Sequence, residues 1–466
     1  MTAGRTGFVM QFFYSRNKLE RNIMLEKLTN PLREEESHKT FLVLGIFLGL
    51  MLSLFMPLFN EPDGQYHLAV SGRIVNTIVD TSRYGEYEIG TGMDGQQSSY
   101  EDGTHFEKYY LNKAVFIDAA NLPRNIKFTY YNFVYWGHLI PALGLKIGSL
   151  IYPSLGVMVT IGRTLNMLVS VVLVYLIIKR LKAAKLLYLA VYLSPVVLNS
   201  FASLTYDSTG YIAVGFLLMQ CINLIADREY RITKSSALLT LFSIIFTAKQ
   251  NYWLLLLLYA YCFVEYQLQD DSKVKQIYRS IRSFLSRHKL LSLIGFALPA
   301  FALAYVITLR YGGIVQVAKR FFLTTVFAYS KAYGVNSWFS EPYPSFNNMP
   351  TWTTALWVIL IFTLLFSLEK FNKRKEVSLL ALFLFVLGIV GVYFMQLNYN
   401  GASTSYIEGV QGRYFTPTIL LLALVTSFTT LTIKVKERYF LTAFAYLTVI
   451  LTNGMMLFNT IINLMR

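Results

Sequence analysis

Long hydrophobic segments alternate with short charged ones along almost the whole chain. Each hydrophobic segment holds roughly 17 to 25 mainly apolar residues, the length at which an α-helix crosses the hydrocarbon core of a bilayer. Lipid offers backbone groups no hydrogen-bond partner, so these segments are expected to be helical. The pattern predicts about eleven crossings, near residues 41–59, 155–178, 185–200, 209–226, 236–248, 252–266, 289–309, 353–369, 377–396, 415–432 and 439–462.

Residues 133–152 are also apolar but are not expected to cross the membrane. We interpret them as helices that lie on the outer surface or dip into it. The residues that interrupt the segment are Gly137, His138, Pro141, Gly144, Lys146 and Gly148.

Lys and Arg gather in alternate loops, as expected when those loops face the cytoplasm. The N-terminus is then cytoplasmic, and the long polar loops lie outside. The sequence therefore predicts a basic cytoplasmic arm at 1–40 and a polytopic domain at 41–466. The outer loops 60–154 and 310–352 are expected to form the functional face.

Composition agrees with a membrane protein: 55% of the 466 residues are hydrophobic and only 15% are charged. The net charge of +16 is spread over short loops rather than gathered in one basic domain, so nucleic acid is not an expected partner. The two cysteines, Cys221 and Cys262, fall inside apolar segments and are expected to be core residues. No nucleotide-binding or metalloprotease motif is visible.

The first outer loop begins with a candidate site. Asn60 is a suitable helix cap, and the acids that follow it suit an opening turn. Asp63 and His67 are four residues apart and share a helix face. They would suit a general base and its orienting partner, or a cation site. The plainer interpretation is that Asp63 only favours the helix dipole while His67 sits in the interface.

Several basic residues fall on the outer side, where positive charge is disfavoured. Arg163, Lys249 and Arg413 are candidate ligands of a phosphate. Arg163 lies inside a predicted span, where an unpaired guanidinium would be costly. For Lys319, Arg320 and Lys331 we favour pairing with acids or lipid headgroups.

Asp207 belongs to a very short outer turn, close to the membrane core. It is either a second functional carboxylate or a helix cap for the next span, and spacing does not separate the two. The residues around it and around Arg413 are candidates for the same site or for structural roles. They are Tyr206, Glu408, Gln411 and Tyr414.

Four segments together resemble a family of bacterial polytopic membrane proteins that looks like part of the GT-C glycosyltransferase superfamily. They are Pro62-Asp63 with His67, Gly162-Arg163 with Asn166, Ser203 to Asp207, and Gln411 to Tyr414 before Pro417. The family pattern commonly has a second acid after the aspartate, where this chain has Gly64. That departure leaves Asp63 as the main candidate.

The resemblance implies a GT-C-like helical bundle whose first outer loop carries juxtamembrane helices. It also implies sugar transfer from a polyprenyl-phosphate donor to a glycan or lipid-linked acceptor, with inversion. Asp63 would be the base, and Arg163, Lys249 and Arg413 would bind the lipid phosphate. The setting would be the outer face of the bacterial cytoplasmic membrane.

No cofactor is required by this reading, and Asp63 with His67 alone would make a weak site for a divalent cation. The alternatives are a transporter or flippase of lipid-linked sugars and a polymerase or ligase of surface polysaccharide. The sequence shows no inverted repeat of the kind that favours alternating access.

Overall fold

The computed structural model describes residues 34–59, 61–84, 106–118, 131–328, 336–343, 347–401, 404–436 and 438–465. Within these ranges the regular structure is helical, apart from one isolated antiparallel bridge between Val79 and Phe116. The all-α prediction is therefore confirmed. Asn60, Lys331 and most of the N-terminal arm lie outside the described residues.

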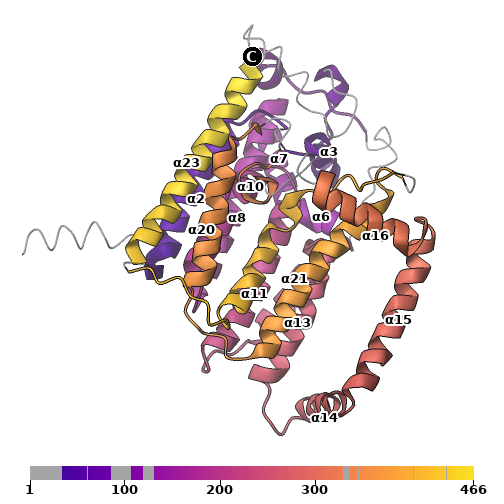
Figure 1. The fold of residues 1–466 in the computed structure, drawn as a ribbon. Coiled ribbons are helices and arrows are strands. Elements are labelled where there is room, and N and C mark those ends of the chain that lie inside the picture. Colours follow the sequence, from indigo (N-terminus) through magenta and orange to yellow (C-terminus); the bar gives the residue numbers. More distant parts are fainter. Residues whose placement is uncertain are drawn as a thin grey trace, which may run out of the picture.

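The helices follow one another along the chain (Figure 1). Those before residue 270 are α2 (Ser37–Phe55), α3 (Gly64–Ile74), α6 (Phe133–Gly137), α7 (Leu139–Ile151), α8 (Leu155–Arg180), α9 (Lys185–Tyr192), α10 (Pro195–Phe201), α11 (Asp207–Ala226), α12 (Lys234–Phe242) and α13 (Leu255–Cys262). Those after it are α14 (Lys273–Arg287), α15 (Lys289–Leu309), α16 (Gly313–Leu323), α18 (Asn336–Phe339), α20 (Thr351–Ser367), α21 (Lys375–Met395), α22 (Leu422–Thr426) and α23 (Arg438–Met465).

Short 3₁₀ and π segments extend or connect these helices. They are η2 (Glu34–Glu36), η3 (Thr81–Tyr84), η4 (Glu107–Leu111), η6 (Ser243–Thr247), η7 (Gln250–Leu254), η8 (Phe263–Gln267), η9 (Thr324–Ala328), η10 (Gln396–Asn398), η11 (Gly412–Tyr414) and η12 (Thr416–Leu421).

Five helices of the described chain are long and apolar enough to cross a membrane, and a bent pair raises the number to six. The five are α2 with η2, α8, α11, α21 with η10, and α23; the pair, bent by 83°, joins the end of α15 to α16 and η9. The described structure therefore supports five or six of the eleven predicted crossings, and the others coincide with shorter helices. The predicted span 185–200, for example, divides into α9 and α10, because Pro195 begins a new helix.

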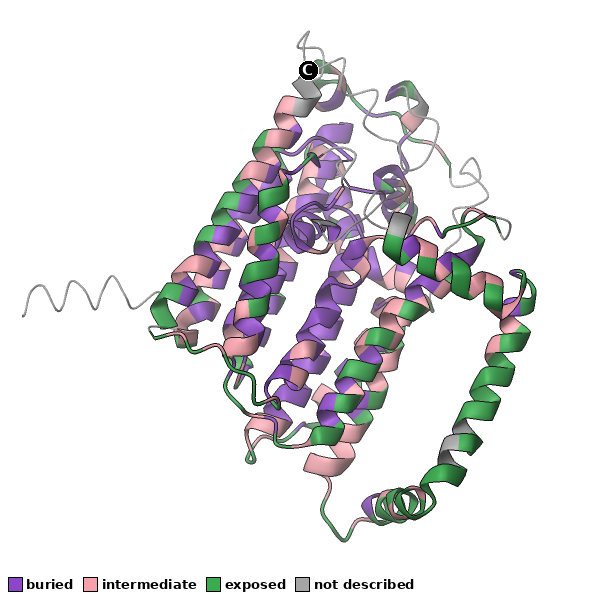
Figure 2. Cartoon of the chain, viewed as in Figure 1, coloured by how far each residue is buried: buried purple, intermediate pink, exposed green. Residues whose placement is uncertain are grey.

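The core lies among α8, α9, α10 and α11, of which α9, α10 and α11 are buried along most of their length (Figure 2). Every residue from Leu186 to Tyr192 is buried, as expected for a helix that is apolar all round. Cys221 and Cys262 are free and buried in this core, which confirms the prediction made for them.

Residues 133–152 form α6 and α7, and α7 runs antiparallel beside the first half of α8. The two backbones approach closely: a Cβ atom added at Gly144 would lie 2.7 Å from the Cα of Gly162, and one at Gly148 would lie 2.7 Å from the Cα of Met158. The 13 residues of α7 reach about 20 Å, less than the hydrocarbon core. The segment therefore packs against α8 and is too short to cross the membrane by itself.

Ion pairs join loops that were predicted to share one side of the membrane. Their grouping matches the alternation of Lys- and Arg-rich loops in the sequence. The pairs at one end are Arg438–Glu34, Lys182–Asp227, Arg374–Glu265 and Arg282–Glu376, and those at the other are Arg163–Glu61, Lys249–Asp207 and Arg413–Asp207.

Candidate functional site

Asp63 ends the loop after α2 and is the residue before α3. Its backbone is left-handed, with φ 62° and ψ 27°, a conformation that Asp tolerates better than most residues. Its side chain is exposed and makes no capping hydrogen bond. The helix therefore begins later than the sequence predicts, at Gly64 rather than at Glu61.

Gly64 is required by the packing of this turn. A Cβ atom added there would lie 2.9 Å from the Cβ of Phe59 and 3.0 Å from its Cα, closer than Cβ atoms approach in practice. The backbone of Phe59 is itself left-handed, with φ 62°. A side chain larger than that of glycine therefore does not fit at position 64 in this turn.

Gly64→Ala is expected to destabilise the protein by about 1–3 kcal/mol, because the added methyl group overpacks the turn. Thermal unfolding of the purified protein in detergent measures this. Gly295→Ala is the matched control, since nothing lies within 4 Å of a Cβ atom placed there. Equal unfolding temperatures for the two variants would contradict the account of this turn.

In the described structure the imidazole of His67 makes its hydrogen bond elsewhere than to the carboxylate of Asp63. The hydrogen bond between the two residues is a backbone one, from the His67 amide to the Asp63 carbonyl oxygen at 3.0 Å. The imidazole instead hydrogen-bonds to His138, with 2.9 Å between His67 Nδ1 and His138 Nε2. Spacing along one helix could not indicate a partner 71 residues away.

The contacts of His138 set the protonation of both rings. Its Nδ1 faces the carbonyl oxygen of Val134, which only accepts, so Nδ1 carries a proton. Burial lowers the pKa of His138 to about 4, although the Val134 carbonyl and Asp207 oppose this. The ring is therefore neutral at pH 7, and its Nε2 accepts the proton of His67 Nδ1.

His67 is neutral for similar reasons. Burial lowers its pKa well below the usual range, and the nearby His138, Arg413 and Lys249 lower it further. With a proton on Nδ1, its Nε2 is a bare acceptor. That atom is buried and has no hydrogen-bond partner among the described residues.

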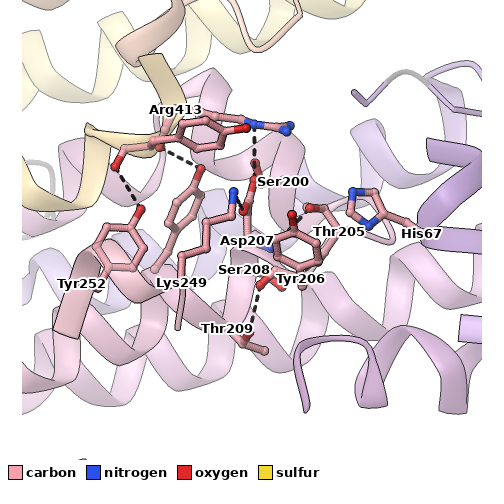
Figure 3. A network of polar contacts seen from close by, with 12 residues as sticks. His67, Ser200, Thr205, Tyr206, Asp207, Ser208, Thr209, Lys249, Tyr252 and Arg413 are labelled. Carbon is pink, nitrogen blue, oxygen red and sulfur yellow. Dashed lines mark hydrogen bonds and ion pairs between the residues drawn. The ribbon is translucent and has the colours of Figure 1, made fainter. Parts of the chain in front are cut away.

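Asp207 lies between two cations from distant parts of the chain (Figure 3). Lys249, between η6 and η7, places its Nζ 2.6 Å from Asp207 Oδ1. Arg413, in η11, places its Nε 3.3 Å from Asp207 Oδ2. The carboxylate of Asp207 is 2% exposed. Asp207 is the first residue of α11, and this helix end has no side-chain capping hydrogen bond, so Asp207 acts as an ion-pair partner more than as a cap.

Tyrosines surround the two cations. Lys249 Nζ lies 3.9 Å from the ring centroid of Tyr414 and 5.0 Å from that of Tyr206, both distances suited to cation–π contact. Tyr211 donates a hydrogen bond to the carbonyl oxygen of Arg413 at 3.1 Å, and Tyr252 donates one to that of Tyr414 at 3.0 Å. Hydrogen bonds from α11 and η7 thus hold the backbone of Arg413 and Tyr414 in place.

Tyr211 and Tyr252 were missed by reasoning from sequence. Tyr211 follows Asp207 by one helical turn, and that spacing was the only available clue. Glu408, by contrast, contacts Tyr406 and raises the pKa of that phenol. Glu408 therefore interacts with Tyr406.

Asp63 belongs to the same electrostatic environment. Burial disfavours the charged form of Arg413, but Asp207, the neighbouring tyrosines and Asp63 outweigh it, so the pKa of Arg413 is raised. Asp63 and Asp207 therefore both act on Arg413, and Asp207 also pairs with Lys249. Asp63 is the exposed member of the four.

Buried polar atoms without a hydrogen-bond partner gather in this region of the described chain. Each such atom typically costs about 1–3 kcal/mol, so a group of them favours a site that a ligand completes. They are Gln65 Nε2, His67 Nε2 and Gln411 Oε1, whereas Asp207 Oδ2 and Arg413 Nε lie 3.3 Å apart and pair with each other.

Arg163 is not part of this group. Its Nη2 lies 3.3 Å from Glu61 Oε2, and it donates hydrogen bonds to the carbonyl oxygens of Met56 at 3.1 Å and Pro57 at 2.8 Å. Glu61 also accepts from the amide of Leu204 at 3.4 Å. Arg163 is 1% exposed, so it ties the loop after α2 to α8 and to the turn before Asp207.

The remaining basic residues that were predicted to face outward differ in their surroundings. Arg320 is buried and donates to neutral acceptors, among them the carbonyl oxygen of Leu397 at 3.2 Å and the Asn400 side chain at 3.0 Å, rather than to an acid. Lys319 is exposed on α16. Among the described residues, no three His, Cys, Asp or Glu side chains come together as metal ligands.

A search of curated proteins and a search of solved structures each found no match. One family model matches residues 46–422, more than three quarters of the chain. The matched range includes α2, Asp63, His67, Asp207, Lys249 and Arg413. The chain is therefore a multi-pass membrane protein and belongs to the family described as predicted membrane protein (DUF2142).

Proposed function

We propose that the chain is a membrane glycosyltransferase of the GT-C type. It takes a sugar from a polyprenyl-phosphate carrier and transfers it to a hydroxyl group of a cell-envelope glycan or lipid-linked acceptor, on the extracytoplasmic face. The observation that carries this proposal is an exposed carboxylate, Asp63, within electrostatic reach of Arg413, which shares the buried carboxylate of Asp207 with Lys249.

Asp63 is the base in this proposal. Its carboxylate is exposed, so an acceptor can approach it, and it is not engaged as a helix cap. In the step, an acceptor oxygen bonds to the anomeric carbon while its proton passes to Asp63, and the bond from that carbon to the phosphate oxygen breaks. Attack opposite the leaving group inverts the anomeric centre.

Lys249 and Arg413 stabilise the polyprenyl phosphate as it leaves. Both cations are held in place before the reaction by Asp207 and by tyrosines, which is the arrangement that makes electrostatic stabilisation effective. Arg413 offers the planar fork that suits phosphate oxygens. Asp207 is then the counterion that orients the two cations.

His67 and Arg163 have different roles in this proposal from those expected from sequence. His67 is bonded to His138, so it neither orients Asp63 nor carries charge at neutral pH. Its free Nε2 suits acceptance of a hydrogen bond from a sugar hydroxyl. Arg163 positions the loop that carries Asp63.

The test is transfer by the purified full-length protein, in detergent or nanodiscs, from a polyprenyl-phosphate sugar to a panel of glycan acceptors. Formation of a glycosidic bond with inversion supports the proposal. Movement of lipid-linked sugar across a vesicle bilayer without bond formation would instead identify a flippase. Joining of whole preassembled chains, with no transfer of single sugars, would identify a polymerase or ligase.

Lys249→Met is expected to lower kcat by about 10²–10³-fold, because it removes one of two charges that stabilise the departing phosphate. KM for the donor should change less. Lys319→Met, an exposed cation on α16, is the control and should leave both constants unchanged. A Lys249→Met enzyme with the parent kcat would show that Lys249 serves only to neutralise Asp207.

A further inference from the structure

The helix α14 has one basic side and one apolar side. Its basic residues are Lys273, Lys275, Arg279, Arg282 and Arg287, and it contains no acid. Four apolar residues recur at intervals of three and four and are each more than half exposed: Val274, Ile277, Ile281 and Phe284. An apolar stripe of this kind, beside Lys and Arg, is typical of helices that lie in the plane of a membrane surface.

The position of α14 fits that setting. Figure 1 shows it nearly end-on, at the base of α15 and across the direction of the bundle helices. α15 stands apart from α21 and α13 in the same view, and Figure 2 shows it exposed along its length. Apolar residues such as Leu290, Leu298 and Val306 are all more than 60% exposed on α15, so lipid must surround that helix.

Two of the basic residues of α14 remain available to bind an anionic ligand. Lys275 and Arg279 pair with Asp270, and Arg282 pairs with Glu376. Lys273 and Arg287, at the two ends of the helix, are exposed and form no ion pair within the described part of the chain. They lie near the border of the apolar stripe and on the polar side, where a headgroup phosphate can reach them.

We propose that α14 is a docking surface for anionic phospholipid headgroups at the membrane face opposite the glycosyltransferase site. The apolar stripe enters the acyl-chain boundary, and Lys273 and Arg287 bind headgroup phosphates. Each basic residue at such a surface strengthens the affinity for anionic lipid by about fivefold. The proposal is independent of sugar transfer.

The experiment places a bimane fluorophore on the full-length protein in nanodiscs of phosphatidylcholine, with or without phosphatidylglycerol. Ile281→Cys labels the apolar stripe, and Gln276→Cys labels the opposite, exposed side. Cys221 and Cys262 are buried, so the parent protein is the labelling blank. Lipids with a doxyl group near the head of the acyl chain quench dye in the membrane, and iodide quenches dye in water.

Doxyl quenching is expected to be severalfold stronger at position 281 than at 276, with the reverse for iodide. Phosphatidylglycerol should strengthen doxyl quenching at 281, and Lys273→Gln with Arg287→Gln should remove that gain. Iodide quenching at 281 equal to that at 276 would overturn the proposal. Protection of 281 from both quenchers would also overturn it, because a protein, such as a second copy, would then cover the stripe.

Discussion

Replacing Asp63 with Asn is expected to lower kcat for sugar transfer by about 10²–10⁴-fold without unfolding the protein. The amide has nearly the shape of the carboxylate but cannot take the acceptor's proton. Asp63 is exposed and makes no capping bond, so its loss removes little packing. Initial rates with a polyprenyl-phosphate sugar, together with thermal unfolding, measure the two effects separately.

Asp118→Asn is the matched control, because Asp118 is an exposed acid in the same predicted outer loop. It should transfer sugar at the parent rate. The two variants remove the same charge, so a difference between them reports the position of Asp63 and not the net charge of the loop. Parent activity in a folded Asp63→Asn protein would remove Asp63 as the base.

Glu61→Ala is expected to destabilise the protein by about 3–5 kcal/mol, because it leaves the Arg163 guanidinium buried without a countercharge. Arg163 is 1% exposed and Glu61 3%, so neither is screened by water. Arg163→Ala should have a similar effect, leaving the Glu61 carboxylate unpaired. Unfolding temperatures in a single detergent measure both changes.

The double variant Glu61→Leu with Arg163→Met tests the cause. Replacing both members of a buried ion pair with apolar groups is often close to neutral. The double variant should therefore be more stable than either single alanine variant, while Lys319→Ala, an exposed cation, should match the parent. Additive losses in the double variant would mean that the two residues act separately.

Hydropathy alone placed several helices almost to the residue. The predicted spans 289–309 and 377–396 correspond to α15 (Lys289–Leu309) and α21 (Lys375–Met395). Both are apolar all round, so length and composition suffice. The predicted span 415–432 instead became η12 and α22, which end at Thr426. Arg413 lies just before this segment. The packing of the group around Asp207 therefore competes there with formation of a regular α-helix.

The partners of the polar residues were beyond the reach of a single sequence. Lys249, Asp207 and Arg413 could each be singled out because a charge near the membrane core demands compensation. Their pairing depends on helices that meet only in the folded bundle. Glu61 shows the same limit: its place in an opening turn suggested interaction with the helix dipole, whereas a buried guanidinium from α8 binds it.

The ion pairs around Asp207 also impose an order on biosynthesis. Asp207 is translated before both of its cations, and Lys249 follows on the next predicted outer turn. Arg413 arrives only near the end of translation, with Tyr211 and Tyr252 already in place to receive its backbone. A chain truncated before η11 therefore inserts its early helices but never assembles the site.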